Sequence, residues 1–516
     1  MSTSPRAARR RLPRASSGIA AAARTSSASG AGRRAGSGAA GRARARVDRR
    51  RSPLQARLFI GASPARSAGA ANSLAISPSR SYVKVHESPF GIRRRQELQM
   101  RPLACLPIVF LAAGQSSPAA APAAWPRFRG PEGAGVAQGA KIPVSWSEAD
   151  VAWRIDLPGH GHSSPVSWGD RVFVTCGDKA TAKRVVLGLK AADGGILWKR
   201  EYDSQPHPMN KMNSYASATP AVDAERVYVT WTTPAQVTLL ALRHDGAEVW
   251  RREDIGRYAS QHGGGASPIV WEDLVILPND TEEKEGKESF ILAVEAKTGK
   301  TAWTHVRKSV KASYGTPCLF QPPAEPPQLI YAGKDHGFTG LDPRTGKLIW
   351  ELDKAFPLRV VCSPTVAGGL VVASCGEGGK GHSVVAVRPG TRERPGDAAI
   401  AWTLTKSVPY VPTPLVANGL LFLWSDGGIV QCVRPATGEV LWSERVGGEY
   451  FASPVCVDGR VYNISKAGEV VVLAASERFE VLARNPAGEG SYATPAVVGG
   501  RMLVRTFTRL VAVGGK

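Results

Sequence analysis

The sequence has few cysteines, and they form no pattern that would hold a metal or a haem. Seven cysteines occur in 516 residues, no two are adjacent, and no Cys-x-x-Cys pair is present, which argues against zinc sites and c-type haem attachment. His160 and His162 could share a metal, but the spacing offers no third ligand, so we predict no metal site. The six cysteines beyond residue 105 could pair in an oxidising compartment, although their spacing indicates no particular pairing; they are Cys176, Cys318, Cys362, Cys375, Cys432 and Cys456.

The patterns of common catalytic sites are also absent. We find no Ser-His-Asp order, no phosphate-cradling glycine loop and no local pair of carboxylates, so we predict no catalytic residue. The acidic run at residues 280–285 is expected to be the solvated tip of a hairpin loop.

Acidic residues are scarce at the N-terminus. Residues 1–99 hold 21 Lys and Arg against three acidic residues, whereas the rest of the chain holds 45 against 40. The formal charge of +23 therefore belongs mainly to the first 99 residues, and the remainder has no composition that favours nucleic-acid binding. Residues 1–99 have no apolar periodicity, so we predict a disordered basic leader. It is either a tail that binds something acidic or the product of a start codon placed too early.

Long hydrophobic runs are missing as well, which excludes a membrane-spanning helix. The longest apolar run, residues 103–113, follows Met100 and Arg101 and precedes small residues. That order is typical of a signal peptide. We predict a signal peptide at residues 100–124 with Met100 as the true start, cleavage before Trp125, and a secreted or periplasmic product. No cysteine stands where a lipid anchor would need one.

What the chain does contain is a repeat. A Ser/Thr-Pro pair occurs eight times, at intervals of 40 to 55 residues. A short apolar strand, a turn and a second strand follow each pair, and then a third strand, a Gly turn and a Trp. Each repeat therefore predicts a four-stranded propeller blade, with the Trp packed against its neighbour. The chain is predicted to be an all-β, eight-bladed β-propeller at residues 151–516, preceded by an N-terminal arm at residues 125–150.

The last repeat supplies only three strands before the chain ends. Residues 151–157, which carry Trp153, form a strand that no repeat precedes. We predict that this strand completes the eighth blade and closes the ring, because closure leaves no open sheet edge between the first and last blades.

The pattern Ala-x-Asp/Glu-x-x-Thr-Gly-x-x-x-Trp, seen best at residues 293–303, resembles the Trp-docking repeat of the pyrroloquinoline-quinone (PQQ) propeller family. The seventh repeat lacks both the Gly and the Trp near residues 475–482. The opening at residues 125–131 (WPRFRGP) is similar to the start of secreted bacterial propellers of this repeat type. The resemblance implies either a quinone-dependent dehydrogenase or a non-catalytic propeller such as the outer-membrane assembly factor.

The segments just before each Ser/Thr-Pro pair are expected to surround the mouth of the central channel, where propellers usually bind ligands. They offer imidazole, amide, phenol and guanidinium groups that could hold a small molecule, a glycan or a protein, or could simply pack against one another. We select as ligand-binding candidates His160, His162, Asn213, Tyr215, His262, Tyr314, Arg359, Tyr410 and Tyr492.

Two functions are compatible with these residues. The first is a monomeric, non-catalytic binding or scaffold propeller outside the cytoplasm. The second is a PQQ-dependent dehydrogenase that uses the same funnel face. Dehydrogenases of the family typically have an adjacent Cys-Cys disulfide, and Glu, Asn and Asp near a calcium ion. The sequence has no such cysteine pair, and the funnel segments supply no carboxylate. We therefore favour the first function and assign no cofactor, with PQQ as the alternative.

Overall fold

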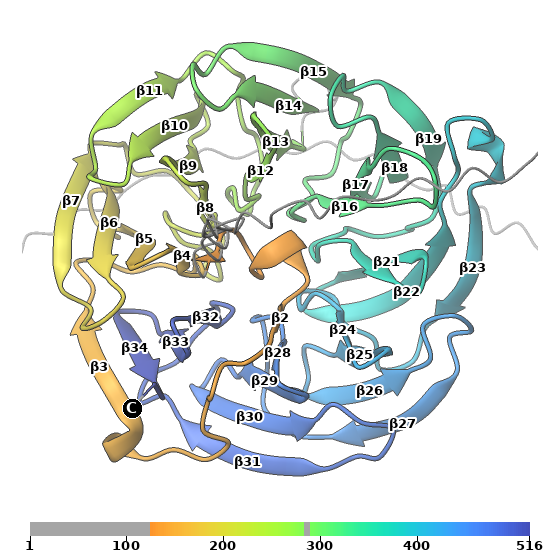
Figure 1. The fold of residues 1–516 in the computed structure, drawn as a ribbon. Coiled ribbons are helices and arrows are strands. Elements are labelled where there is room, and N and C mark those ends of the chain that lie inside the picture. The colour runs from red at the N-terminus through yellow and green to blue at the C-terminus, as the bar shows by residue number, and fades with distance from the viewer. Residues whose placement is uncertain (1–123, 283–288, 516) are drawn as a thin grey trace, which may run out of the picture. The chain divides into compact units, whose positions relative to one another are not determined.

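Eight β-sheets form a ring in the computed structural model, which describes residues 124–282 and 289–515 (Figure 1). The predicted leader and nearly all of the predicted signal peptide lie outside these residues. Each blade contains four antiparallel strands, and two of the eight sheets gain a fifth strand from the N-terminal arm. Tight turns join neighbouring strands within a blade, except at the outer strand of the eighth blade, which comes from residues 151–156. The predicted eight-bladed propeller is confirmed.

In blades one to four, the strands run from the innermost to the outermost in chain order. They are β4 (Val166–Trp168), β5 (Arg171–Gly177), β6 (Arg184–Lys190) and β7 (Ile196–Tyr202); β8 (Ala221–Val222), β9 (Arg226–Thr232), β10 (Val237–Arg243) and β11 (Glu248–Arg252); β12 (Ile269–Trp271), β13 (Leu274–Asn279), β14 (Ser289–Glu295) and β15 (Thr301–Arg307); and β16 (Cys318–Phe320), β17 (Gln328–Gly333), β18 (Gly337–Leu341) and β19 (Leu348–Leu352).

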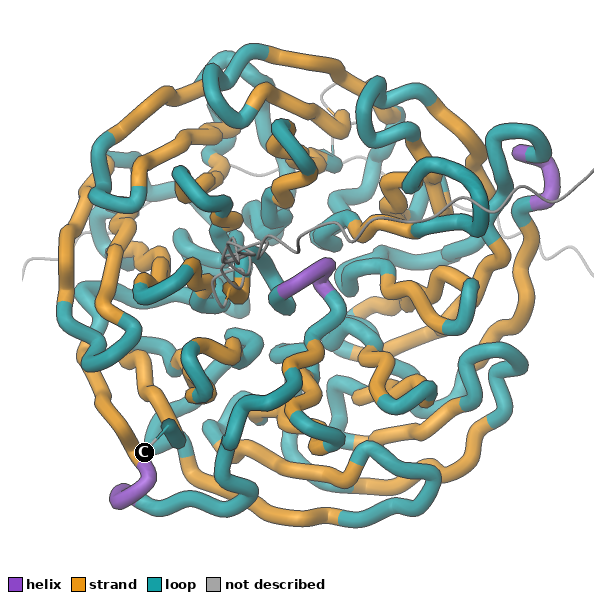
Figure 2. The backbone as a smooth tube through the Cα atoms, in the orientation of Figure 1, coloured by secondary structure: helices purple, strands orange, loops and turns teal. Residues whose placement is uncertain are grey.

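Blades five to eight also run from the innermost strand to the outermost. They are β20 (Thr365–Ala367), β21 (Leu370–Glu377), β22 (Lys380–Arg388) and β23 (Ala399–Leu404); β24 (Leu415–Ala417), β25 (Leu420–Trp424), β26 (Ile429–Val433) and β27 (Val440–Arg445); β28 (Val455–Val457), β29 (Arg460–Ile464), β30 (Glu469–Ala474) and β31 (Val481–Pro486); and β32 (Ala496–Val498), β33 (Arg501–Arg505), β34 (Arg509–Val513) and β3 (Val151–Asp156). The short 3-10 helices are η1 (Pro131–Gly133), η2 (Glu148–Asp150) and η3 (Pro395–Asp397) (Figure 2).

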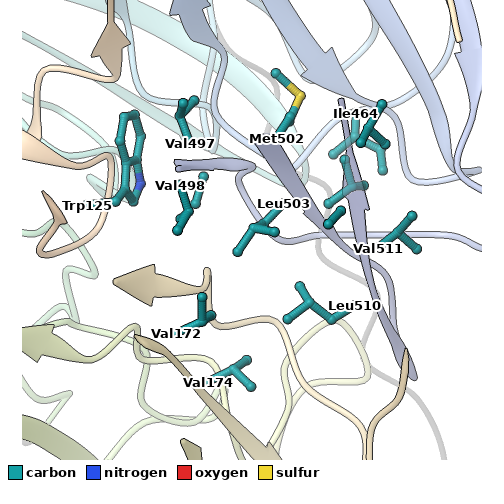
Figure 3. Packing of buried hydrophobic residues seen from close by; sticks show 14 of the residues in the cluster. Trp125, Val172, Val174, Ile464, Val497, Val498, Met502, Leu503, Leu510 and Val511 are labelled. Carbon is teal, nitrogen blue, oxygen red and sulfur yellow. The ribbon is translucent and has the colours of Figure 1, made fainter. Parts of the chain in front are cut away.

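The ring closes between the first and last parts of the described chain. β3 pairs antiparallel with β34, with Trp153 opposite Ala512 and Ile155 opposite Leu510. This pairing confirms the predicted closure, and it ties the eighth blade together from two distant segments. The apolar core of this blade continues into its neighbours: Leu503, Leu510 and Val511 pack in one cluster with Val172 and Ile464 (Figure 3).

Tryptophans on the outer strands connect neighbouring blades. Trp303 of β15 donates a hydrogen bond from Nε1 to the carbonyl of Pro343 in the next blade, at 3.1 Å. Its ring also covers Gly346, where a Cβ atom would collide with the indole and where φ is +67°. The same arrangement joins Trp153 to Gly194, Trp198 to Gly246, Trp250 to Gly299 and Trp402 to Gly438. The Gly of the repeat is therefore explained by the close approach of the preceding blade's Trp.

The seventh blade lacks the Gly and the Trp, and its interface differs accordingly. Trp442 of the sixth blade packs edge-on against Phe479, with ring centroids 5.2 Å apart. Its Nε1 still donates to a backbone carbonyl, that of Ser476, at 3.2 Å. A phenyl ring thus replaces the Gly contact, and all four strands of the seventh blade are present.

The repeated Ser/Thr residues link the inner strands around the channel. In six of the eight repeats, the backbone N–H donates to the hydroxyl oxygen of the equivalent residue in the next blade. Six such bonds measure 2.9 to 3.1 Å: Ser164 to Thr219, Thr219 to Ser267, Thr316 to Ser363, Ser363 to Thr413, Thr413 to Ser453 and Ser453 to Thr494. A buried N–H without a partner is costly, so the accepting hydroxyl explains why Ser or Thr stands at this position in these six links.

The N-terminal arm packs on the face of the ring that carries the turns between first and second strands. β1 (Ala124–Trp125) pairs with β4 of the first blade, and β2 (Val136–Ala137) pairs with β28 of the seventh. η1 lies between them at the centre of the ring (Figures 1 and 2). No helix in the described ranges is long and apolar enough to span a membrane.

The cysteines of the described ranges are all free. Cys176, Cys318, Cys362, Cys375, Cys432 and Cys456 are buried, and none is bonded to another. Cys176, Cys432 and Cys456 lie on apolar strands, as buried free thiols commonly do.

Candidate functional site

A cavity of about 1140 Å³ occupies the centre of the ring. Its wall is made by the segments before each Ser/Thr-Pro pair and by the hairpin loops between second and third strands. The Ser/Thr hydroxyls of all eight repeats line it, and Phe128 of the arm lies at the end opposite those loops. The arm thus contributes one wall of the cavity.

Seven of the nine predicted side chains line this cavity. They are His162, Asn213, His262, Tyr314, Arg359, Tyr410 and Tyr492. His160 and Tyr215 lie outside its lining. The backbone of His160 forms a β-bridge with Gly177, and its ring stacks on Phe507 with centroids 5.1 Å apart. Tyr215 lies under the guanidinium of Arg184 and donates from its hydroxyl to the carbonyl of His207, at 3.1 Å.

An aromatic cluster forms the wall near the eighth blade. The His162 ring lies 4.7 Å from that of Tyr492, which meets Phe451 edge-on at 5.0 Å. Burial, together with the nearby His160 and Arg505, lowers the pKa of His162 to about 3. The imidazole is therefore neutral at ordinary pH and offers a hydrogen-bonding ring rather than a charge.

Amide and phenol groups form the wall near blades two and three. Asn213 donates from Nδ2 to the carbonyls of His262 and Gly264, at 2.7 and 3.1 Å. The hydroxyl of Tyr314 lies 3.1 Å from that of Ser260, and burial raises the pKa of this phenol. These side chains hold neighbouring connections in place while exposing one edge to the cavity.

The acidic run predicted to be a solvated tip is not solvated where the structure describes it, so that prediction was wrong. Asp280 is fully buried and pairs with Arg307, Nε to Oδ1 at 2.8 Å. Glu282 pairs with Arg359, and both side chains are largely buried. The basic partners come from other parts of the chain, and a buried carboxylate needs such a partner.

Carboxylates line the cavity, contrary to what the funnel segments indicated. Asp426 is buried, and it accepts hydrogen bonds from the backbone N–H groups of Tyr410 (2.7 Å) and Val411 (3.2 Å). Burial raises its pKa to about 6 in spite of those bonds. Glu377 and Glu449 also line the cavity.

Asp426 and Glu377 were missed because they belong to the hairpins between second and third strands, whereas Glu449 lies in the connection before Ser453 and was overlooked there. The loop at Ser425–Gly428 reaches the same face as the connection at Tyr410. Asp335, at the equivalent place in the fourth blade, accepts from the N–H groups of Val310 (2.8 Å) and Lys311 (3.1 Å). An Asp in this loop is thus a recognisable signal: it fixes the segment that precedes the Ser/Thr-Pro pair.

The residues present do not fit the quinone site that the family resemblance implies. The six described cysteines lie apart as free thiols. No group of three His, Cys, Asp or Glu side chains in the described ranges is placed to hold a metal ion. The cavity has room for a flat ligand, but the cysteine pair and the metal ligands of that site have no counterpart among these residues.

The fold and its docking Trp residues define a PQQ-repeat β-propeller. The family model described as "Outer membrane protein assembly factor BamB" matches residues 144–305, 211–444 and 383–515, and the chain belongs to this family.

Individual relatives are more distant. Tetrathionate hydrolase of Acidithiobacillus ferrooxidans is 24% identical over 329 residues, which cover 61% of this chain and 52% of the hydrolase. Assembly factor BamB of Moranella endobia is 24% identical over 290 residues, covering 50% of this chain and 67% of that protein. The chain thus spans about half to two thirds of the length of these relatives.

Two solved structures show the same fold. BamB from Moraxella catarrhalis superposes with a TM-score of 0.50 at 16% identity, covering 70% of this chain and 96% of that one. Quinohemoprotein alcohol dehydrogenase from Comamonas testosteroni gives 0.53 at 15% identity, covering 76% and 81%. At these identities the likeness extends to the fold alone.

Proposed function

We propose that this protein is a non-catalytic binding or scaffold propeller that works outside the cytoplasm and holds its ligand at the funnel cavity. The observation that carries the proposal is the convergence of seven predicted side chains, each from a different blade connection, on one cavity of about 1140 Å³. A concave site with a few oriented polar groups is the usual form of a ligand-binding site. The ligand is a protein, a glycan or another small molecule, and nucleic acid is not expected.

The extracytoplasmic location has two supports. One is the apolar run at residues 103–113 with its flanking residues, which lies outside the described part of the chain. The other is the family, whose name refers to assembly of outer-membrane proteins. N-terminal sequencing of the protein from its own cells tests the location. We expect a mature terminus at Trp125, and a terminus within residues 1–99 would contradict it.

The binding role is tested by affinity capture from a periplasmic extract over a range of salt concentrations. We expect a partner or ligand that is retained in a reproducible ratio to the protein. Failure to retain any component at any salt concentration would count against a scaffold role. Size-exclusion chromatography with light scattering in the same buffers checks the expected monomer.

A PQQ-dependent dehydrogenase is the second candidate. The sequence analysis found no carboxylate in the funnel segments, but carboxylates do line the cavity, and this favours the dehydrogenase. Such an enzyme needs a carboxylate near the quinone, and Asp426 lines the cavity. The free cysteines, and the lack of a metal-ligand cluster within residues 124–282 and 289–515, speak against it. Titration of the purified protein with PQQ and calcium separates the two candidates: we expect no saturable spectral change. A stoichiometric change accompanied by dye-linked oxidation of an alcohol or a sugar would establish the dehydrogenase.

A further inference from the structure

The arm crosses the centre of the ring and is held by several blades. The N–H of Trp125 donates to the Ser167 hydroxyl at 3.1 Å, and the N–H of Val222 donates to the Pro126 carbonyl at 2.8 Å. Arg127 donates to the Pro317 carbonyl, and Arg129 donates to Thr365 Oγ1 at 3.4 Å. These contacts reach blades one, two, four and five, so the arm forms a fixed floor across the channel.

The side chains of the arm alternate between the blades and the cavity. Trp125, Arg127 and Arg129 are buried, whereas Phe128 is only half-buried and lines the central cavity. Burial lowers the pKa of the Arg129 guanidinium to about 9, which indicates how closely the arm is packed. An aromatic ring left open to a cavity, between two buried arginines, is apolar surface available to a ligand.

The opposite end of the cavity is rich in positive charge. Its lining includes Lys211, Lys311, Lys334, Arg359, Lys380 and Lys466 against three acidic residues, Glu377, Asp426 and Glu449. Arg359 is paired with Glu282, and Lys466 lies 3.5 Å from Glu449. Among the ion pairs of residues 124–282 and 289–515, none involves Lys211, Lys311 or Lys380. Unpaired cations around a concave opening attract anions.

We propose that the cavity binds an organic anion, with its charged group among the lysines of the mouth and its apolar body against Phe128. The arm is then a part of the binding site and not only a brace of the fold. This inference rests on the proposed binding function, and it names the ligand class for the same cavity. The apolar floor and the cationic mouth match the two ends of one molecule that has an apolar body and an anionic group. A neutral sugar lacks the charge, and an inorganic anion lacks the apolar body.

The test is isothermal titration of the full-length protein with octyl sulfate, octyltrimethylammonium and octyl glucoside, and with inorganic sulfate. We expect octyl sulfate to saturate one site and to bind at least about tenfold more tightly than the other three, with an affinity that falls as salt rises. Equal binding of the cation or the glucoside would overturn the proposal, because a shared octyl chain would then explain all binding.

Variants assign the two halves of the site. Changing Lys211→Gln and Lys311→Gln together should weaken octyl sulfate about tenfold and remove much of the salt dependence. Lys297→Gln is the matched control, since Lys297 is exposed in the turn between β14 and β15 and lies outside the cavity lining. Phe128→Ala should weaken octyl sulfate about tenfold without changing the salt dependence, and Phe128→Leu should restore binding. Wild-type affinity in the lysine variant or in Phe128→Ala would overturn the proposal.

The outcome separates this inference from the proposed function. If octyl sulfate does not bind but affinity capture still retains a component, the anion assignment is wrong and the binding function stands. If neither experiment finds a ligand, both are wrong.

Discussion

His162 lies in the aromatic wall of the cavity, where a proton is disfavoured. Its pKa is lowered from an ordinary 6.5 to about 3 by burial, with His160 and Arg505 adding repulsion. The unfolded chain therefore binds a proton below pH 6.5 that the folded chain does not, and stability falls as the pH drops through the window from about 6.5 to 3.

Replacing His162 with Gln should remove part of this acid sensitivity. We expect the loss of unfolding free energy between pH 7 and pH 4.5 to be about 2 kcal/mol smaller in His162→Gln than in the wild type. Urea unfolding at the two pH values measures it. His382→Gln, at an exposed position on β22, is the control and should lose as much as the wild type. An equal loss in all three proteins would contradict the account.

Asp426 should produce the opposite slope. Its folded pKa of about 6 lies above the ordinary 3.8 because the carboxyl is buried. The folded chain therefore holds the proton longer, and stability falls as the pH rises from about 4 to 6. Asp426→Asn should cancel that decline. The free-energy difference between variant and wild type should shift by about 2 kcal/mol in favour of the variant between pH 4 and pH 7.5. A difference that is constant across this range would show that Asp426 is ionised throughout.

The residue scale also shows what the sequence could and could not predict about the site. Position before a Ser/Thr-Pro pair places a backbone near the channel, and this was enough to place His162 and Tyr410. It does not fix where a side chain turns: Arg184 holds Tyr215 outside the cavity lining. Asp426 comes from a hairpin loop and meets the site only through the fold.

At the scale of the elements, neighbouring blades are joined where the Trp of one blade covers a Gly turn of the next. Gly346 has φ +67° and would direct a Cβ into Trp303, whereas Gly419 has φ +74° and no atom within 4 Å of its Cβ position. Both positions therefore require a residue that tolerates positive φ, and only Gly346 also requires the absence of a Cβ atom.

The pair of variants Gly346→Ala and Gly419→Ala separates these two costs. Each should lose about 1 kcal/mol from the strained φ, and Gly346→Ala should lose a further 1–3 kcal/mol or so from overpacking against the indole. Denaturant unfolding of both variants measures the difference. Equal losses would mean that the Trp contact contributes little to blade docking.

The strands and turns were largely predictable because the same sequence pattern recurs in eight repeats. The Ser/Thr-Pro pair, the turn and the Trp each have a fixed local cause, and the hydroxyl links and Gly contacts supply it. Phe479 shows the limit of this prediction. The sequence of the seventh repeat does not indicate that a phenyl ring replaces the lost Gly contact. The role of Phe128 was equally hidden, because the arm repeats nothing and its place is set by distant blades.

At the scale of the whole molecule, stability depends on closing the ring. β3 supplies the outer strand of the eighth blade, and Trp153 docks on Gly194 of the first. Deleting residues 151–157 should lower Tm by 10 °C or more, roughly, because it removes one strand and one blade contact together. Trp153→Ala keeps the strand and should cost less. An unchanged Tm on deletion would refute the closure.

We propose that the protein binds its ligand in the cavity in the middle of this ring. Native mass spectrometry of the protein purified gently from its own cells tests this most directly, with Gly265→Trp to fill the cavity. Gly265 lines the cavity and has room for a Cβ, and Gly396→Trp, at an exposed position without near neighbours, is the matched control. We predict a bound mass in the wild type and in Gly396→Trp that is absent from Gly265→Trp. The same bound mass in all three proteins would contradict the claim.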